Sequence, residues 1–212
     1  MGTRSVRNVF RIAATLLALG ASSVAIAAEP TDEQVRAAHA AALVVDAHLD
    51  LPAGFATEKN DPGVDGTPQV DLPKLERGGV DVAVLAVFAW QQARTAEQDA
   101  IAMATGREKL AAIRRAAEWY PSRLTLARSA DEVVQAAAAG RRTAVISVLN
   151  ATVLGPKAER LDEYYAAGMR QLGFTHASHN AYADSSRPLP KNGDGATLWG
   201  GLSPLGRALV PR

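Results

Sequence analysis

Apolar residues follow two patterns that alternate along the chain, short continuous runs and longer amphipathic stretches. The short runs are rich in Val, Ile, Leu and Ala, and they predict buried strands at residues 43–51, 80–90, 124–127, 143–149 and 169–176. The amphipathic stretches, bounded by Ser, Thr, Pro or Gly, predict helices at residues 32–40, 71–77, 95–120, 130–139, 161–167 and 203–210. Strands and helices therefore alternate through most of the chain.

Repeated strand and helix units of this length indicate an α/β fold with a parallel sheet. Polar residues at the strand ends favour a (β/α)8 TIM-like barrel over an open doubly wound sheet. Eight such units normally take about 250 residues, whereas this chain has 212 residues and about five predicted strands. We expect residues 28–212 to form one incomplete (β/α) barrel, truncated after about five strands.

The first residues have the pattern of a targeting segment. Arg4, Arg7 and Arg11 form a basic start, residues 12–27 are small and apolar, and Ala25-Ile26-Ala27 matches the small-x-small cleavage pattern. Residues 1–27 are therefore predicted to be a signal peptide, and the mature protein is expected to be periplasmic or secreted. Contact with a membrane would then be transient, through the signal peptide alone.

Composition excludes several classes of function. The chain has 23 Lys and Arg against 22 Asp and Glu, so it has no excess of positive charge with which to bind nucleic acid. It has no cysteine, which removes disulfides, thiol nucleophiles and thiolate metal sites. Any metal site must use histidine and carboxylate ligands, a set that suits zinc or a similar divalent cation.

The first predicted strand ends in the sequence Asp46-Ala47-His48-Leu49-Asp50, directly before Pro52. Side chains two residues apart on a strand project to the same side, so His48 and Asp50 would direct an imidazole and a carboxylate toward one point. Catalytic residues of α/β folds gather at the carboxyl ends of strands, and this placement predicts a metal site. A purely structural histidine is the alternative, because His-x-Asp by itself is a common pattern.

A second polar strand end follows residues 169–176. His176 would close this strand, and His179, Asn180 and Asp184 follow within a few residues. Polar side chains at this position of a barrel strand usually face the active site.

Four blocks, in order, carry a family resemblance. They are VVDAHLDLP at 44–52, VDLPKLERGGV at 70–80, LGFTH at 172–176 with Asn180 and Asp184, and GLSPLG at 201–206. These blocks resemble successive blocks of the membrane (renal-type) dipeptidases, zinc metallopeptidases of family M19. The resemblance implies a distorted (β/α)8 barrel with two zinc ions that hydrolyses dipeptides.

The resemblance also implies roles for individual residues. His48 and Asp50 correspond to ligands of the first metal, and His176 corresponds to an active-site histidine that holds the substrate without binding metal. Leu149, in contrast, stands where the family has a glutamate that bridges both zinc ions. Leucine offers no lone pair to a metal.

The family's remaining ligands follow the helix in which this sequence stops. We therefore expect at most one zinc ion, held by His48 and Asp50, and an impaired or absent dipeptidase activity. A non-catalytic exported peptide-binding protein is the alternative. A hydrolase of the amidohydrolase type ranks third, since that type carries His-x-His where this chain has Asp50. The sequence leaves the preferred dipeptide and the oligomeric state open.

Overall fold

The computed structural model describes residues 29–211, so the predicted signal peptide lies outside the described residues. The chain divides into two compact units, residues 1–38 and 39–212, which are described separately. Helix α2 (Asp32–Ala41) begins in the first unit and has no buried residue. Thr31 and Gln34 cap its start reciprocally: the Gln34 amide donates to Thr31 Oγ1 at 3.2 Å, and the Thr31 amide donates to Gln34 Oε1 at 2.9 Å.

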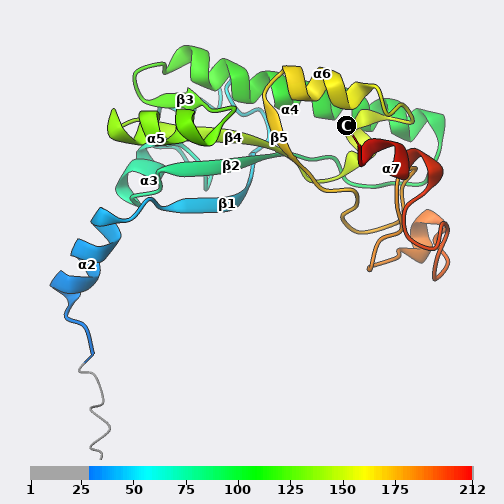
Figure 1. Ribbon diagram of the computed structural model, residues 1–212. Helices are drawn as coiled ribbons and strands as arrows, with labels where there is room; N and C mark the ends of the chain where they lie inside the picture. The colour runs from blue at the N-terminus through cyan, green and yellow to red at the C-terminus, as the bar shows by residue number, and fades with distance from the viewer. Residues whose placement is uncertain (1–28, 212) are drawn as a thin grey trace, which may run out of the picture. The chain divides into compact units, whose positions relative to one another are not determined.

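The second unit is built on one sheet of five parallel strands (Figure 1). Strand β1 (Val45–Asp50) pairs with β2 (Val82–Val87), which pairs with β4 (Arg142–Val148). The edge of β4 that faces away from β2 pairs with two strands. Strand β3 (Leu124–Leu126) pairs with the first part of β4, and β5 (Met169–Leu172) pairs with its last part.

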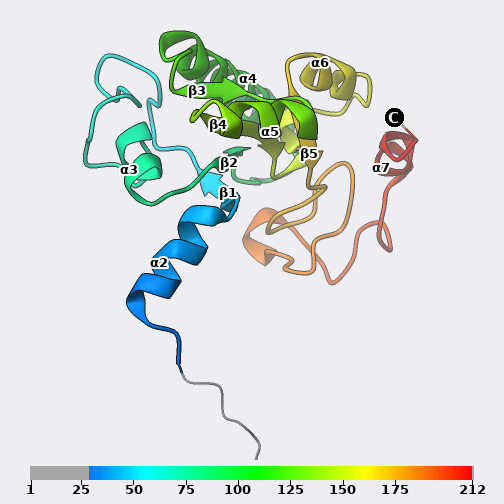
Figure 2. The same cartoon turned by 60° about the vertical axis from the view of Figure 1, so that its left-hand side comes forward.

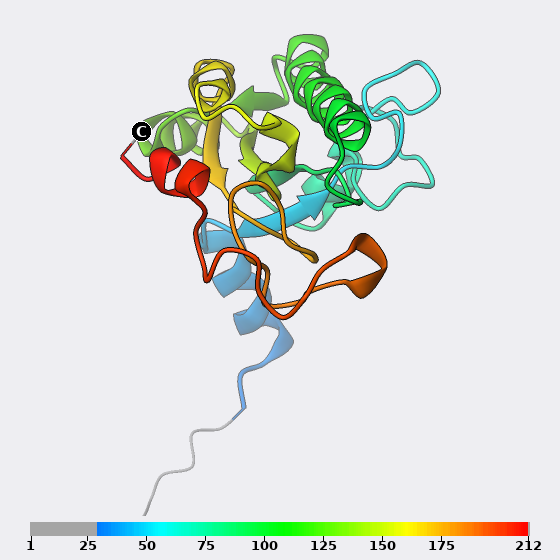
Figure 3. The same cartoon turned by 90° about the vertical axis from the view of Figure 1, so that its right-hand side faces the viewer.

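Helices follow the strands as a (β/α) fold requires. They are α3 (Leu72–Arg77), α4 (Ala96–Trp119), α5 (Ala130–Ala138), α6 (Arg160–Ala166) and α7 (Pro204–Leu209), with 3₁₀ turns η1 (Ala151–Leu154) and η2 (Pro190–Asn192). Side chains of Asp71, Thr95, Ser129 and Ser203 cap four of the helices. Figures 1 and 2 show α4 and α6 along one face of the sheet, and Figure 3 shows the long segment after β5 toward the other.

The predicted α/β class with a parallel sheet is confirmed, and the arrangement is that of a partial barrel. The predicted end of the last strand is wrong, because β5 ends at Leu172 and not at His176. The chain turns at Gly173, whose amide donates to Val148 O at 2.7 Å. A Cβ atom at this position would lie 2.6 Å from the Leu149 carbonyl oxygen, so only glycine fits here.

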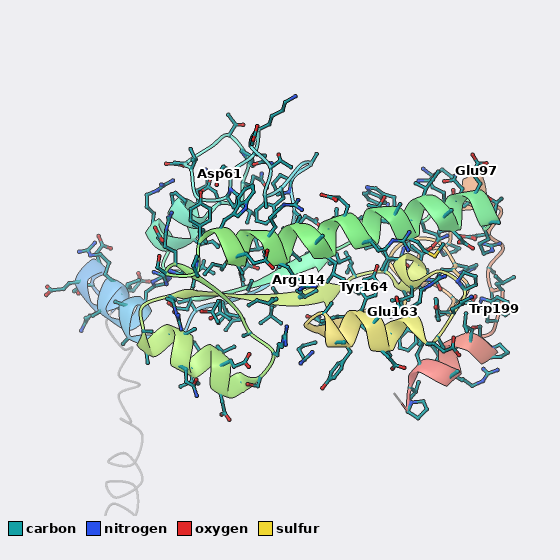
Figure 4. All side chains as sticks on the ribbon, turned by 90° about the horizontal axis from the view of Figure 1, so that it is seen from above. Asp61, Glu97, Arg114, Glu163, Tyr164 and Trp199 are labelled. Carbon is teal, nitrogen blue, oxygen red and sulfur yellow. The ribbon has the colours of Figure 1, made fainter. Side chains whose placement is uncertain are left out.

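Apolar side chains of the central strands form the core with α4 and α6. Ile113 of α4 and Ile146 of β4 are completely buried. Gly106 lets α4 approach η1 and α6, because a Cβ atom there would lie 2.6 Å from both Val153 Cβ and Tyr164 Oη. Figure 4 shows Tyr164 between α6 and α4. Among the described helices, none has the length and apolar character needed to span a membrane.

We predict that Gly106→Ala destabilises the fold by about 1–3 kcal/mol, through overpacking against Val153 and Tyr164. Helix propensity alone would favour the alanine by about 1 kcal/mol. The sign of the change in the free energy of unfolding therefore shows whether overpacking or helix propensity dominates. Urea denaturation measures it. Ala111→Gly, at an exposed position of the same helix, measures the propensity term by itself. A stabilised Gly106→Ala variant would contradict the close packing.

Candidate functional site at the carboxyl ends of the strands

His48 and Asp50 lie together on the edge strand β1. His48 Nε2 is 3.7 Å from Asp50 Oδ1, and the two side chains are 45% and 68% exposed. Strand β1 has one extra residue relative to β2 between Asp46 and Leu49, which is a β-bulge. The Asp46 carboxylate accepts a hydrogen bond from the His48 amide at 3.1 Å and fixes the backbone there. The predicted convergence of an imidazole and a carboxylate is therefore present.

Leu149 follows the end of β4 on the same side of the sheet as Asp50. The register places Asp50 level with Ala86 and Ala86 level with Ser147, and Leu149 lies two residues beyond Ser147. Its side chain is half-buried. The end of β4, two strands away from the His48 and Asp50 pair, thus presents an aliphatic group.

His176 lies in the loop after β5 and packs against two aromatic residues of the loop after β2. The ring centroid of His176 is 5.0 Å from that of Phe88 and 5.4 Å from that of Trp90, both edge to face. Phe88 and Trp90 are themselves 5.1 Å apart. Phe88 is buried, whereas Trp90 is 64% exposed. We call these three residues the aromatic wall. Among the described residues, no hydrogen bond, ion pair or ring contact joins the His176 side chain to His48 or Asp50, so the imidazole belongs to the wall.

Lys109 of α4 brings a positive charge to the same edge. Its Nζ atom lies 5.8 Å from the centre of the Phe88 ring, within the range of a cation–π contact. Burial lowers the pKa of Lys109, and the negative charge of Asp50 partly opposes this shift.

Two fully buried amides, Asn150 and Asn180, join the strand ends. Asn180 Nδ2 donates to Asn150 Oδ1 at 2.8 Å and to Phe174 O at 2.6 Å, and Asn150 Nδ2 donates to Ala89 O at 3.3 Å. Asn180 Oδ1 also accepts from the amides of Tyr182 and Ala183. Because its oxygen is already engaged and buried, Asn150 is not available as a substitute metal ligand.

His179 is a structural residue. It is completely buried. Nδ1 accepts from the Ser185 amide at 3.0 Å, and Nε2 lies 3.0 Å from Gly195 O. A neutral ring protonated at Nε2 satisfies both contacts.

Two aspartates organise the loop after β5 by accepting hydrogen bonds from it. Asp194 accepts from Ser178 Oγ and from the amides of His179 and Leu189. Asp184 accepts from Thr197 Oγ1 and from the amides of residues 198–201. Burial by itself would raise the pKa of each carboxyl, but these donors outweigh it and hold both pKa values well below the usual range.

His48 and Asp50 fall short of the ligand set of a catalytic zinc ion. Three protein ligands normally hold such an ion, and His48 and Asp50 supply two. Within residues 29–211, no three His, Asp or Glu side chains come close enough to share a metal. Leu149 offers no third donor, so the described residues do not fit a two-metal centre or a complete one-metal site.

The parallel βα units and the polar groups at their carboxyl ends define a protein of the (β/α)-barrel class. The family model for membrane dipeptidases, Peptidase family M19, matches residues 32–212. The chain belongs to this family, as its sequence blocks predicted.

Known proteins of this kind are similar over most of the chain. The crystal structure of the probable dipeptidase PvdM from Pseudomonas aeruginosa superposes with a TM-score of 0.79 at 32% identity, covering 84% of this chain and 46% of PvdM. Dipeptidase tcpJ of Claviceps purpurea is 26% identical over 153 residues, which are 70% of this chain and 35% of tcpJ. The chain thus spans about a third to a half of the length of these relatives.

A third likeness concerns the fold alone. A metallo peptidase from Rhodobacter sphaeroides, solved with a phosphinate mimic of the dipeptide L-Ala-D-Ala, superposes with a TM-score of 0.58 at 21% identity. The match covers 79% of this chain and 54% of that protein.

Sequence reasoning missed the residues that hold the site together. Arg94 and Asp194 form an ion pair across one hundred positions of sequence, and Asp194 has a fully buried side chain. The only local signal was the density of Ser, Asn, Asp and Gly after residue 176, which is typical of a loop with side-chain to backbone bonds.

We predict that Asn180→Ala destabilises the protein by about 2–4 kcal/mol, because it leaves several buried donors and acceptors unpaired. Asn60→Ala is the control. It removes one amide bond, to Ala53 O, from an exposed loop, and it should cost about 1 kcal/mol or less. Urea denaturation compares the variants, and equal losses would contradict the central role of Asn180.

Stability should fall as the pH drops below about 4, the usual pKa of an unfolded aspartate. Asp194 has a lowered pKa in the folded state, so its contribution is present above that pH and is lost as the folded carboxyl becomes protonated. Asp194→Asn should flatten this decline in urea melts at pH 2.5 to 6. Asp131→Asn, at an exposed position of α5, is the control, and an unchanged slope in Asp194→Asn would contradict the assignment.

Proposed function

We propose that this protein is of the zinc-dependent dipeptidase type. Its 212-residue chain binds a single divalent cation and hydrolyses dipeptides poorly or not at all. The observation that carries the proposal is Leu149, an aliphatic side chain after the end of β4, on the same side of the sheet as Asp50. The names of the relatives, a probable dipeptidase and a dipeptidase, support a dipeptide as ligand. The dipeptide mimic bound to the Rhodobacter sphaeroides peptidase supports the same ligand class.

His48 and Asp50 would hold the cation from one side, with water completing its coordination. An exposed two-ligand site binds zinc weakly, because each missing ligand removes a favourable bond and leaves the ion hydrated. Because the donor set falls short of a catalytic site, we assign no catalytic step to the metal in this chain.

His176 would contact the bound peptide. Its imidazole is exposed at the rim of the strand ends, and one face of it is already packed against Phe88 and Trp90. A ring held in this way keeps an N–H free to donate to a peptide carbonyl oxygen. The role that the family resemblance implies for His176, substrate contact without metal ligation, agrees with this position.

A non-catalytic peptide-binding protein is the second candidate. The exposed Trp90 favours it, because a large aromatic surface beside an incomplete metal site can still bind a ligand. The two candidates differ in whether peptide binding needs the metal. Export to the periplasm or the exterior remains part of the proposal for either function, and residues 1–27 carry it.

We predict that zinc binds weakly by isothermal titration and that His48→Ala or Asp50→Ala weakens it at least about tenfold, equivalent to about 1.4 kcal/mol. Leu149→Glu should strengthen binding by at least about the same factor, since it adds a carboxylate donor after the end of β4. Leu43→Glu adds the same group at an exposed position before β1 and should leave the affinity unchanged. Equal effects of the two glutamates would contradict the site.

We also predict that the purified, zinc-loaded chain of this length hydrolyses dipeptides too slowly to measure in a release assay for free amino acids. Robust turnover that depends on His48 and Asp50 would contradict the impaired site. Peptide binding that persists after removal of zinc with a chelator would favour the second candidate.

A further inference from the structure

Two loops at the carboxyl ends of the strands are joined by side-chain bonds. The loop after β2, residues 88–95, carries Phe88, Trp90 and Arg94, and the loop after β5 carries His176 and Asp194. Arg94 forms an ion pair with Asp194, and its second amino group lies 3.3 Å from Gly193 O. Asn192 Nδ2 also donates to Gln91 O at 2.9 Å, so the two loops meet at several points.

Asp194 connects Arg94 to the segment that carries His176, because its two carboxylate oxygens bind on opposite sides. Oδ1 of Asp194 faces Arg94, while Oδ2 accepts from Ser178 Oγ at 2.5 Å and from the His179 amide at 3.0 Å. Ser178 has a φ of +75°, a value that few non-glycine residues adopt and that surrounding bonds must maintain. The backbone two residues beyond His176 is thus fixed to the carboxylate that Arg94 binds.

The aromatic wall lies where the two loops meet. Trp90 is 64% exposed, so burial in the core does not determine the position of its indole. Its edge-to-face contacts with Phe88 and His176 are weak compared with the backbone entropy that two loops lose on becoming ordered. A separate connection has to hold the loops together for the wall to form.

We propose that Arg94 is a positioning residue: through Asp194 it holds the loop of His176 against Trp90 and Phe88, and so fixes the imidazole at the rim of the site. The inference rests on the proposed function, in which His176 contacts the bound peptide. Arg94 is suited to this task because it adds an ion pair to the hydrogen bond from Asn192 to Gln91 O that also joins the loops. The bonds of Asp194 to Ser178, His179 and Leu189 lie within its own loop and remain when Arg94 is removed.

The alternative is that Arg94 contributes only to general stability. An ion pair with one fully buried partner is costly to break wherever it lies, so a loss of stability does not distinguish the two roles. A readout of the distance between Trp90 and His176 does, because only the positioning role predicts a change there.

The experiment uses tryptophan fluorescence of the full chain, followed from pH 8 to pH 5. A protonated imidazole in contact with an indole quenches its emission, and histidine titrates in this range. The part of the pH-dependent change that disappears in His176→Gln is the signal of the Trp90 and His176 contact. Arg94→Ala should lose more than half of that signal, and Arg94→Lys, which keeps a charged donor for Asp194, should retain more than half.

Arg123→Ala is the matched control. Arg123 forms a two-bond ion pair with Glu76 at the opposite end of the sheet, beside the start of β3. The variant should lower stability while it keeps the full His176-dependent signal. If circular dichroism shows that Arg94→Ala does not fold, Arg94→Gln replaces it and is judged by the same criterion.

Retention of more than half of the signal in Arg94→Ala, or in Arg94→Gln where that variant replaces it, would overturn the proposal. So would the absence of any His176-dependent signal in the wild-type protein, because the wall would then not exist in solution. The measurement needs neither zinc nor a dipeptide, so a failure of the proposed function, seen as absent zinc binding, is distinguishable from a failure of this inference.

Discussion

The buried hydrogen bond between the side chains of Asn150 and Asn180 is the constraint on which the site depends. Burial of an unpaired side-chain amide would destabilise the fold, and each of these amides has hydrogen-bond partners for most of its donors and acceptors. Their partners belong to three different strand ends, Ala89 after β2, Asn150 after β4 and Phe174 after β5. The carboxyl edge of the sheet is therefore held together by side chains, where the regular pairing of the strands has already ended.

The titratable side chains on this edge are held in place to different degrees by their neighbours. His176 is held by the aromatic wall and by the loop that Asp194 organises, whereas His48 and Asp50 project from an exposed edge strand at a bulge. The described residues thus combine a firmly held imidazole at His176 with an exposed pair of donors at His48 and Asp50. This contrast explains why family membership and fold are clear while catalytic competence is not implied by them.

Much of the fold follows from local patterns that the sequence displays. The apolar runs predicted all five strands, and the amphipathic stretches predicted the helices that Thr95 and Ser129 cap in the structure. The pairing of His48 with Asp50 also followed from strand periodicity, and the two side chains lie 3.7 Å apart although the bulge between Asp46 and Leu49 includes His48. The end of β5 was missed because the close approach at Gly173 depends on Leu149, a residue that follows a different strand, β4.

The polar framework of the site could not be predicted in the same way. Arg94 and Asp194, and likewise Asn150 and Asn180, are brought together by the return of the chain across the sheet, and no periodicity marks them. The roles of His48, Asp50 and His176 remain predictions from family resemblance, to which the structure adds their positions.

Hydrogen exchange of the Tyr182 and Ala183 amides, measured by NMR, tests the central claim most directly, since both donate to the buried oxygen of Asn180. We expect these two amides to exchange as slowly as the amides of β2 and β4, near the limit set by global unfolding. Exchange as fast as that of Val64, in the exposed loop before α3, would contradict it.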